Sequence, residues 1–197
     1  MRFSLLLMIA LVFSACSDKP KEEQHYIEKL YKRGDVIVLK GVEGGVKKLK
    51  RLDRGFEIVG EEDKILMLDF FGTFCPPCQK EASALTALQI DFSDKMTMIG
   101  LTSFEEVSDK YVVENFSNKY GAHYFIANSK KNARIAKSVL EDIAYLDPMQ
   151  LPFKVVLKNG KYQILKDVWY GKDDGRFYIG DVGIKTIRED LEKLIGK

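Results

Sequence analysis

Two cysteines separated by two prolines, Cys75-Pro76-Pro77-Cys78, are the residues of this 197-residue chain best suited to chemistry. A thiol pair at this spacing can make and break a disulfide, because one thiolate attacks and the second thiol resolves the mixed disulfide. The pair follows the apolar run Ile65–Phe71, which predicts a buried strand, and precedes a segment typical of a helix. Unpaired N–H groups at a helix start favour negative charge, so this position favours the thiolate of Cys75.

Half of a zinc site is the main alternative use of such a pair. Structural zinc needs four Cys or His ligands, normally from a second paired motif. The sequence has no second CxxC, and His25 and His123 stand alone. Thiol–disulfide chemistry is therefore the favoured interpretation.

Length and net charge limit the number of domains and the kinds of partner. The length suits one domain with a full hydrophobic core. A formal net charge of +2 leaves no excess of Lys and Arg to neutralise phosphates, which argues against nucleic acid as a partner.

The N-terminal residues 1–15 are typical of a secretory signal peptide. Arg2 gives a short positive region, and the apolar run Leu5–Phe13 is too short to cross a membrane comfortably. The following Ser14-Ala15-Cys16 resembles the lipobox of bacterial lipoproteins, in which the cysteine becomes lipidated. Phe13 departs from the usual Leu, and ordinary cleavage near Ala15 with a free Cys16 thiol is the alternative.

Lipidation of Cys16 would leave Cys75 and Cys78 as the thiols of the mature protein. This indicates that the cysteines of the mature protein are reactive groups rather than members of structural disulfides. We expect residues 16–33, which are polar and charged at their start, to form a tether to the membrane. Asp18, two places after the lipidated cysteine, favours inner-membrane retention in some bacteria.

Helical and strand patterns alternate along the rest of the chain. Short β-branched runs between residues 35 and 59 predict strands or a hairpin. Further strands are predicted at 65–71, 96–101 and 123–126, helices at 76–92, 105–120, 135–143 and 184–194, and a hairpin at 153–169 with an Asn159-Gly160 turn. This order predicts an α/β fold with a mixed sheet.

The segment 68–81, LDFFGTFCPPCQKE, resembles the active-site strand, loop and helix start of the thioredoxin superfamily. The resemblance is greatest to the membrane-anchored TlpA-like or ResA-like proteins and covers residues 34–197. It implies a thioredoxin-like fold, a central mixed sheet flanked by helices, here with an N-terminal β extension. A second landmark is the segment 149–157, MQLPFKVVL, where the family has a cis proline. By this resemblance Pro152 and the backbone before it lie beside the sulfurs and pair with substrate; a trans proline opening a strand is the alternative.

The resemblance also assigns roles to two acids. Asp69 matches the buried acid that helps manage the proton of the second cysteine, and burial would raise its pKa toward neutrality. Glu81 matches a glutamate of the cytochrome-maturation reductases; a solvated acid in the first helical turn is the alternative. Phe74 replaces the usual Trp, and Ser83 stands where that subgroup often has Pro. No cofactor is implied beyond the redox-active disulfide.

The expected function is an extracytoplasmic, lipid-anchored thiol-disulfide oxidoreductase. It would act as a reductase on envelope proteins, with apocytochrome c a candidate substrate, and receive electrons from a membrane thiol-disulfide donor. One alternative is an oxidase or isomerase of the same fold, which differs in redox poise. The other is a non-catalytic lipoprotein that binds copper or a partner through Cys75 and Cys78.

Overall fold

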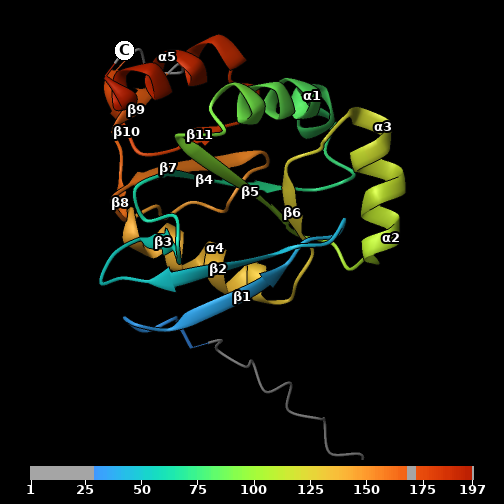
Figure 1. Ribbon diagram of the computed structural model, residues 1–197, viewed down its shortest axis with the longest axis horizontal. Helices are drawn as coiled ribbons and strands as arrows, with labels where there is room; N and C mark the ends of the chain where they lie inside the picture. The colour runs from blue at the N-terminus through green and yellow to red at the C-terminus, as the bar shows by residue number, and fades with distance from the viewer. Residues whose placement is uncertain (1–28, 168–171, 197) are drawn as a thin grey trace, which may run out of the picture.

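A six-stranded mixed sheet lies at the centre of the computed structural model, which describes residues 29–167 and 172–196 (Figure 1). The strands are β4 (Ile65–Phe71), β5 (Met96–Thr102), β6 (Phe125–Ala127), β7 (Phe153–Lys158), β8 (Lys161–Tyr162) and β11 (Tyr178–Ile179). Strands β4, β5 and β6 are parallel, and β7 runs antiparallel to β4. Every residue of β4 and β5 is buried, as their continuous apolar runs require. The expected α/β architecture is confirmed.

Helices cover one face of this sheet and share the other face with a second sheet. Helices α1 (Pro76–Asp91) and α5 (Ile184–Ile195) lie together on one face, and α4 (Lys131–Asp142) lies on the opposite side (Figure 1). Each helix buries a stripe of side chains at helical spacing; in α1 these are Cys78, Glu81, Ala82, Leu85 and Leu88. The two sides of the sheet carry separate hydrophobic clusters.

The expected N-terminal β extension is a three-stranded antiparallel sheet. Its strands are β1 (Val36–Lys40), β2 (Val46–Arg51) and β3 (Phe56–Ile58), in that spatial order. Ile37, Leu39 and Leu49 point inward and join the same cluster as Ile135 of α4. A short ribbon of β9 (Leu165–Asp167) and β10 (Lys172–Gly175) lies next to α5.

The helix predicted at 105–120 begins later than expected. It starts at Asp109 and consists of α2 (Asp109–Val112), a π-helical turn η1 (Val113–Ser117) and α3 (Asn118–Tyr120). Ser108 caps it by accepting the Tyr111 N–H at 3.1 Å. Ser108 has extended backbone, so the helix cannot include the residues before it, and the Glu105 carboxylate instead accepts hydrogen bonds from Thr73. The short strand predicted at 123–126 begins at Phe125.

The N-terminal predictions lie outside the described residues. These are the signal peptide 1–15, Cys16 and most of the tether 16–33. The end of the second arm of the predicted hairpin, residues 168–169, also lies outside. Across residues 29–167 and 172–196, no helix has the length and apolar character to cross a membrane.

Candidate active site

A disulfide joins Cys75 and Cys78 at the start of α1. Cys75 is the N-cap residue with extended backbone, and its Sγ accepts the Cys78 N–H at 3.4 Å. Pro76 and Pro77 occupy the first helical positions, where the N–H groups they lack would have no intrahelical partner. Cys75 is only 5% exposed and Cys78 2%, so attack on the pair comes at a small opening around Cys75.

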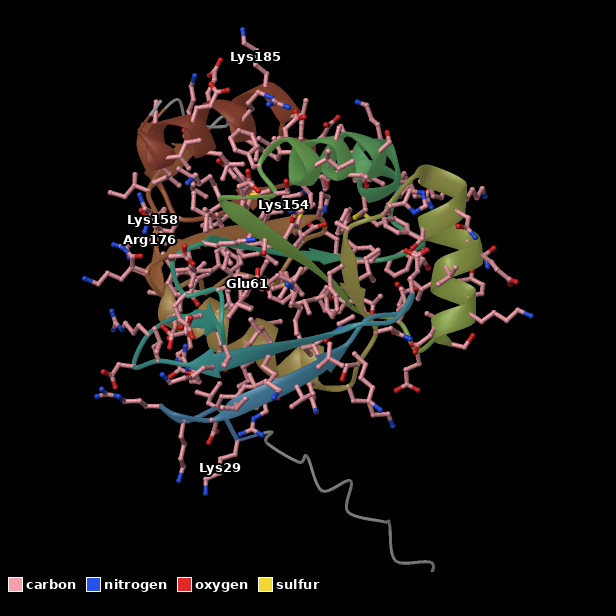
Figure 2. All side chains as sticks on the ribbon, in the orientation of Figure 1. Lys29, Glu61, Lys154, Lys158, Arg176 and Lys185 are labelled. Atoms are coloured by element: carbon pink, nitrogen blue, oxygen red, sulfur yellow. A yellow bond between two sulfur atoms is a disulfide. The ribbon has the colours of Figure 1, made fainter. Side chains whose placement is uncertain are left out.

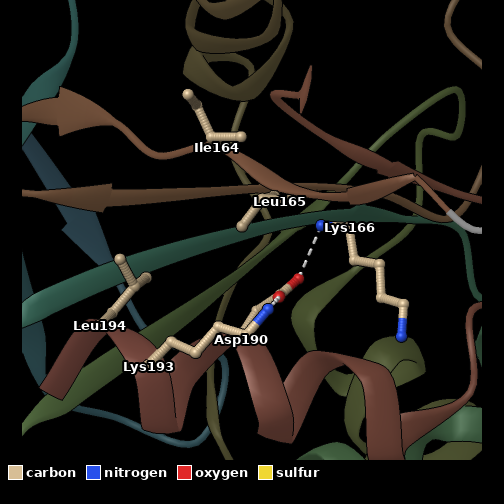
Figure 3. A pocket seen from close by; sticks show the side chains of 6 residues that line it. All are labelled: Ile164, Leu165, Lys166, Asp190, Lys193 and Leu194. Atoms are coloured by element: carbon tan, nitrogen blue, oxygen red, sulfur yellow. Dashed lines mark hydrogen bonds and ion pairs between the residues drawn. The ribbon is translucent and has the colours of Figure 1, made fainter. Parts of the chain in front are cut away.

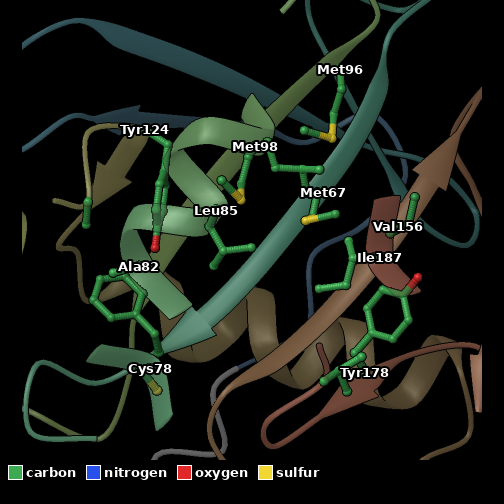
Figure 4. Packing of buried hydrophobic residues seen from close by; sticks show 14 of the residues in the cluster. Met67, Cys78, Ala82, Leu85, Met96, Met98, Tyr124, Val156, Tyr178 and Ile187 are labelled. Carbon is green, nitrogen blue, oxygen red and sulfur yellow. The ribbon is translucent and has the colours of Figure 1, made fainter. Parts of the chain in front are cut away.

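The disulfide rests on the hydrophobic cluster between α1 and the central sheet. Figure 4 shows Cys78 in that cluster with Ala82 and Leu85 of the same helix and Met67 of β4. Leu151, the residue before Pro152, packs against this cluster too. The site is therefore held by packing from several elements rather than by a flexible loop.

Three charged side chains are buried on the same side of the structure. Asp69 lies in the middle of β4, and Lys154 lies directly opposite it on β7. Lys154 Nζ is 3.5 Å from Asp69 Oδ1 and donates a short hydrogen bond to Glu81 Oε1 from α1. Lys154 is 0% exposed, Asp69 1% and Glu81 9%. Figure 2 shows Lys154 within the body of the protein, whereas Lys29 and Lys185 project from its surface. We call these three residues the Lys154 cluster.

The Lys154 cluster is incompletely neutralised. With both acids ionised it holds two negative charges and one positive charge. Asp69 Oδ1 and Glu81 Oε2 are buried without a hydrogen-bond partner. The other Asp69 oxygen accepts the Tyr124 hydroxyl at 3.2 Å. Buried carboxylate oxygens that lack partners favour the protonated acid.

The pKa values of both acids respond to this environment. Burial raises the pKa of Asp69, while Lys154 and the Tyr124 hydroxyl act in the opposite direction. Burial also raises the pKa of Glu81 to about 7; Lys154 opposes the shift and the charge of Asp69 adds to it. A carboxyl that titrates near neutral pH can take and release a proton under physiological conditions.

Both acids that the resemblance assigns a role are buried. Asp69 is buried, as the resemblance implies. Glu81 lies one helical turn after Cys78 and is buried, which excludes the alternative of a solvated helix acid. Sequence reasoning missed Lys154, although a lysine inside the apolar strand FKVVLK is a recognisable signal. A charged residue in a central strand has to meet a partner there.

The Leu151–Pro152 peptide bond is cis. Strand register puts Phe153 opposite Phe70, so Pro152 lies at the end of β4 from which the CxxC loop departs. The Pro152 carbonyl accepts the Gly180 N–H at 2.9 Å, which fixes this turn to the sheet edge. The cis bond is the one that the resemblance implies, and the alternative of a trans proline is wrong.

A shallow hollow between β9 and α5 is lined by Ile164, Leu165, Lys166, Asp190, Lys193 and Leu194 (Figure 3). Its one acid, Asp190, already accepts the Lys166 N–H at 2.8 Å and the Tyr178 hydroxyl at 2.7 Å. Across residues 29–167 and 172–196, no group of three or more His, Cys, Asp or Glu side chains could hold a metal ion.

Comparison with solved structures identifies the fold. A thiol:disulfide interchange protein of the thioredoxin family from Chlorobium tepidum superposes with a TM-score of 0.54 at 15% identity, over 84% of this chain and 97% of that one. The present chain places its CxxC disulfide at a strand-to-helix junction and a cis proline at the same end of the sheet. This chain has a thioredoxin-like fold.

Other relatives agree with this assignment. A secreted Mycobacterium tuberculosis disulfide oxidoreductase gives a TM-score of 0.52 at 14% identity, over 80% of this chain and 95% of that one. In sequence, thioredoxin-1 of Drosophila melanogaster is 33% identical over 60 residues, 29% of this chain and 56% of that protein. The thioredoxin-like protein YneN of Bacillus subtilis is 26% identical over 77 residues, 39% of this chain and 45% of YneN. The sequence matches thus span about half of these relatives, and no protein-family model matches the chain.

Proposed function

We propose that this thioredoxin-like protein is a thiol-disulfide oxidoreductase that works outside the cytoplasm as a disulfide reductase. The observation that carries the proposal is the Cys75–Cys78 disulfide at the start of α1, with Glu81, whose pKa is about 7, one turn further along that helix. The pair supplies the two electrons of the reaction, and the buried carboxyl supplies a place for a proton.

The reaction proceeds in two exchanges. The Cys75 thiolate attacks a substrate disulfide, a mixed disulfide forms, and the first substrate sulfur leaves as a thiolate. Cys78 then gives its proton to the Glu81 carboxylate, and its thiolate attacks Cys75 Sγ. The second substrate sulfur leaves and takes a proton. The cysteine pair loses two electrons, and the substrate disulfide gains them.

Lys154 and Asp69 set the proton affinity of Glu81 in this scheme. Lys154 favours the ionised carboxylate that accepts the proton, and Asp69 favours the protonated form that follows. Pro152 presents the adjoining backbone to the substrate chain, as the resemblance implies. We therefore propose that four residues act directly on the reacting groups: Cys75, Cys78, Glu81 and Pro152. Asp69 is a second site that can hold a proton.

Reduction of insulin disulfides by the protein, with dithiothreitol as electron source, tests the activity. Cys75→Ser should abolish turnover because the attacking sulfur is lost, and Cys78→Ala should accumulate mixed disulfides because the resolving thiol is missing. Ser83→Ala, a change in the same helix away from the sulfurs, serves as a matched control and should keep its activity. Equal turnover by Cys75→Ser and the unchanged protein would refute the proposal.

Equilibration with reduced and oxidised glutathione distinguishes the reductase from an oxidase or isomerase. A reduction potential near that of thioredoxin, about −270 mV, supports a reductase, whereas one near about −120 mV supports an oxidase. Binding of copper(I) at one equivalent, together with absence of turnover, would instead support the metal-binding alternative.

We propose that the chain is exported and anchored by lipid at Cys16, with residues 1–15 removed, residues 16–33 as tether and residues 34–197 as the folded domain. The secreted relative and the signal-like N-terminus support this location. Cys16→Ser should release the protein from the membrane fraction while insulin reduction is retained. Its substrates would be envelope proteins, including apocytochrome c as a candidate, with a membrane dithiol protein as the electron donor.

A further inference from the structure

Positive charge is concentrated in the N-terminal part of the described chain. Residues 29–58, which contain β1, β2 and β3, have nine Lys and Arg against four Asp and Glu. Residues 59–197 have 19 Lys and Arg against 21 Asp and Glu. The formal net charge of +2 for the whole chain therefore hides a basic N-terminal sheet on a slightly acidic domain.

Lysines alternate with valines on the outer face of this sheet. Ile37 and Leu39 of β1 point into the core, so the residues on either side of them point outward. Across the antiparallel ladder each outward valine stands opposite a lysine. The pairs are Val36 with Lys50, Val38 with Lys48, and Val46 with Lys40. We call these six residues the valine–lysine face.

The valine–lysine face is exposed and its charge is mostly uncompensated. Its valines are between 39% and 55% exposed. Glu57 of β3 forms an ion pair with Lys50 at 2.9 Å. Within the residues that the structure describes, neither Lys40 nor Lys48 forms an ion pair, and both are exposed. The face thus offers both apolar groups and free cations to a partner.

The chain enters the domain beside this face. The Arg134 guanidinium of α4 donates to the Leu30 carbonyl at 3.0 Å and lies over the Tyr31 ring, 3.9 Å from its centroid. This fixes the segment that leads into β1, and Lys29 projects on the same side of the protein as β1 (Figures 1 and 2). Cys16 is 13 positions before Lys29. A lipid on Cys16 would therefore keep Lys29 within about 45 Å of the bilayer.

We propose that the valine–lysine face binds the surface of an anionic phospholipid bilayer and so fixes the orientation of the anchored domain. The lysines contact lipid phosphates, and the valines between them lose contact with water at the edge of the acyl region. A basic surface beside a lipid anchor gives a second attachment to the membrane. A second copy of the chain is disfavoured, because two such faces would bring lysines against lysines. The inference builds on the proposed export and anchoring.

This orientation leaves the disulfide accessible. Ile37 and Leu49, which lie beneath the face, belong to the hydrophobic cluster on one side of the central sheet. Cys75 and Cys78 belong to the cluster on the other side. Figure 1 likewise shows β1 and β2 on the side of the protein away from α1 and α5. With the face on lipid, the active site is turned away from the bilayer.

Lysine footprinting on vesicles tests the face directly. The full chain is mixed at low salt with vesicles of phosphatidylglycerol and phosphatidylcholine in equal parts, treated briefly with an acetylating reagent and analysed by mass spectrometry. Acetylation of Lys40 and Lys48 should be at least about fivefold slower than without vesicles. Lys119 of α3 and Lys185 of α5 should react at an unchanged rate. No slowing at the first pair, or equal slowing at both pairs, would overturn the proposal.

Charge reversal on the face gives an independent measure. Lys40→Glu with Lys48→Glu should weaken co-sedimentation with the same vesicles at least about tenfold. Lys119→Glu with Lys185→Glu changes the net charge equally and should bind within about twofold of the unchanged face. All the proteins carry Cys16→Ser, so that a lipid does not mask the loss; without lipid the face binds reversibly, and washed membranes still release the protein. An equal loss in both pairs, or none in the first, would overturn the proposal.

Insulin reduction separates this inference from the proposed function. The variant with Lys40→Glu and Lys48→Glu should reduce insulin at the unchanged rate, which also shows that it is folded. Insulin reduction without protection on vesicles would overturn the membrane face and leave the oxidoreductase intact, and protection without reduction would do the reverse. Tighter binding to a single-stranded oligonucleotide than to vesicles would overturn the proposal in favour of nucleic acid. A dimer in analytical ultracentrifugation that the charge reversal dissociates would overturn it in favour of a second copy.

Discussion

Two buried ionic clusters of this protein differ in how completely they are satisfied. In the first, Arg51 of β2 donates two hydrogen bonds to Asp142 at the end of α4, the second at 2.7 Å. Asp142 also accepts the Gly55 N–H at 2.7 Å and the Tyr162 hydroxyl at 2.9 Å. One cation meets one anion, and neither carboxylate oxygen lacks a donor. The Lys154 cluster, by contrast, has two acids for one cation and two carboxylate oxygens without hydrogen-bond partners.

The difference separates a structural cluster from one suited to chemistry. The Arg51–Asp142 cluster joins the N-terminal sheet to α4 and β8, and its hydrogen bonds are complete. The Lys154 cluster lies under α1, which carries the disulfide, and can accept a proton with modest change in energy. Burial of a charged side chain therefore does not by itself indicate function. Buried carboxylates that lack hydrogen-bond partners and lie near a reactive group do indicate it.

The largest effect on stability is expected for Asp142→Asn. This change leaves the buried guanidinium of Arg51 without an anion, and breaking such a pair costs about 3–5 kcal/mol. Urea unfolding monitored by circular dichroism measures the loss. Insulin reduction per folded molecule should be unchanged. A loss below about 1 kcal/mol would show that the two clusters do not differ as described.

Glu81→Gln should flatten the dependence of stability on pH. In the folded protein Glu81 titrates at about 7, against an ordinary value of 4.5. Between these values the folded state holds a proton that the unfolded chain releases, so the free energy of unfolding falls as pH rises from 4.5 to 7. The fall amounts to about 3 kcal/mol.

Unfolding measured at several pH values tests this prediction. Glu81→Gln should remove most of the fall, whereas Glu114→Gln, a change of an exposed acid, should leave it in place. The same slope in both variants would contradict a neutral pKa for Glu81.

Lys154→Met should move the pH profile of insulin reduction upward by about one pH unit or more. Lys154 lowers the pKa of both Asp69 and Glu81, so its removal leaves them protonated to higher pH. Stability should suffer less than in Asp142→Asn, because the two acids can neutralise themselves by binding protons. Lys158→Met, on the same strand but outside the cluster, is the control. An unchanged profile in Lys154→Met would exclude the cluster from proton transfer.

The smallest effect is expected for Tyr162→Phe. The change removes one of the hydrogen bonds to Asp142 and should cost about 1 kcal/mol of stability without altering any pH profile. Urea unfolding at neutral pH measures it, with Tyr111→Phe on the exposed surface as the control. A pH-dependent loss would indicate that this cluster also titrates.

Much of the architecture could be predicted from local patterns. The apolar run 65–71, the prolines that start α1 and the Asn159-Gly160 turn each reflect interactions among near neighbours. The helix predicted from residue 105 begins only at Asp109, because Ser108 is an extended N-cap, and Glu105 bonds Thr73, 32 residues earlier in the chain. The N-terminal sheet was expected only in outline, because pairing of β1, β2 and β3 depends on register as well as on pattern.

The sequence by itself determined which chemistry this protein can perform. Two cysteines three positions apart at a helix start can form a reversible disulfide wherever that helix lies, because the sulfurs, the cap and the helix dipole are all local. Tertiary structure decided where the proton can go. Lys154 and Glu81 are 73 residues apart in the chain. The contact between them, which shifts the pKa of Glu81, forms only when α1 packs against the sheet that contains β7. The proton affinity of a buried carboxyl depends on the low dielectric of the interior and on charges from distant segments. Neither can be deduced from a short stretch of sequence.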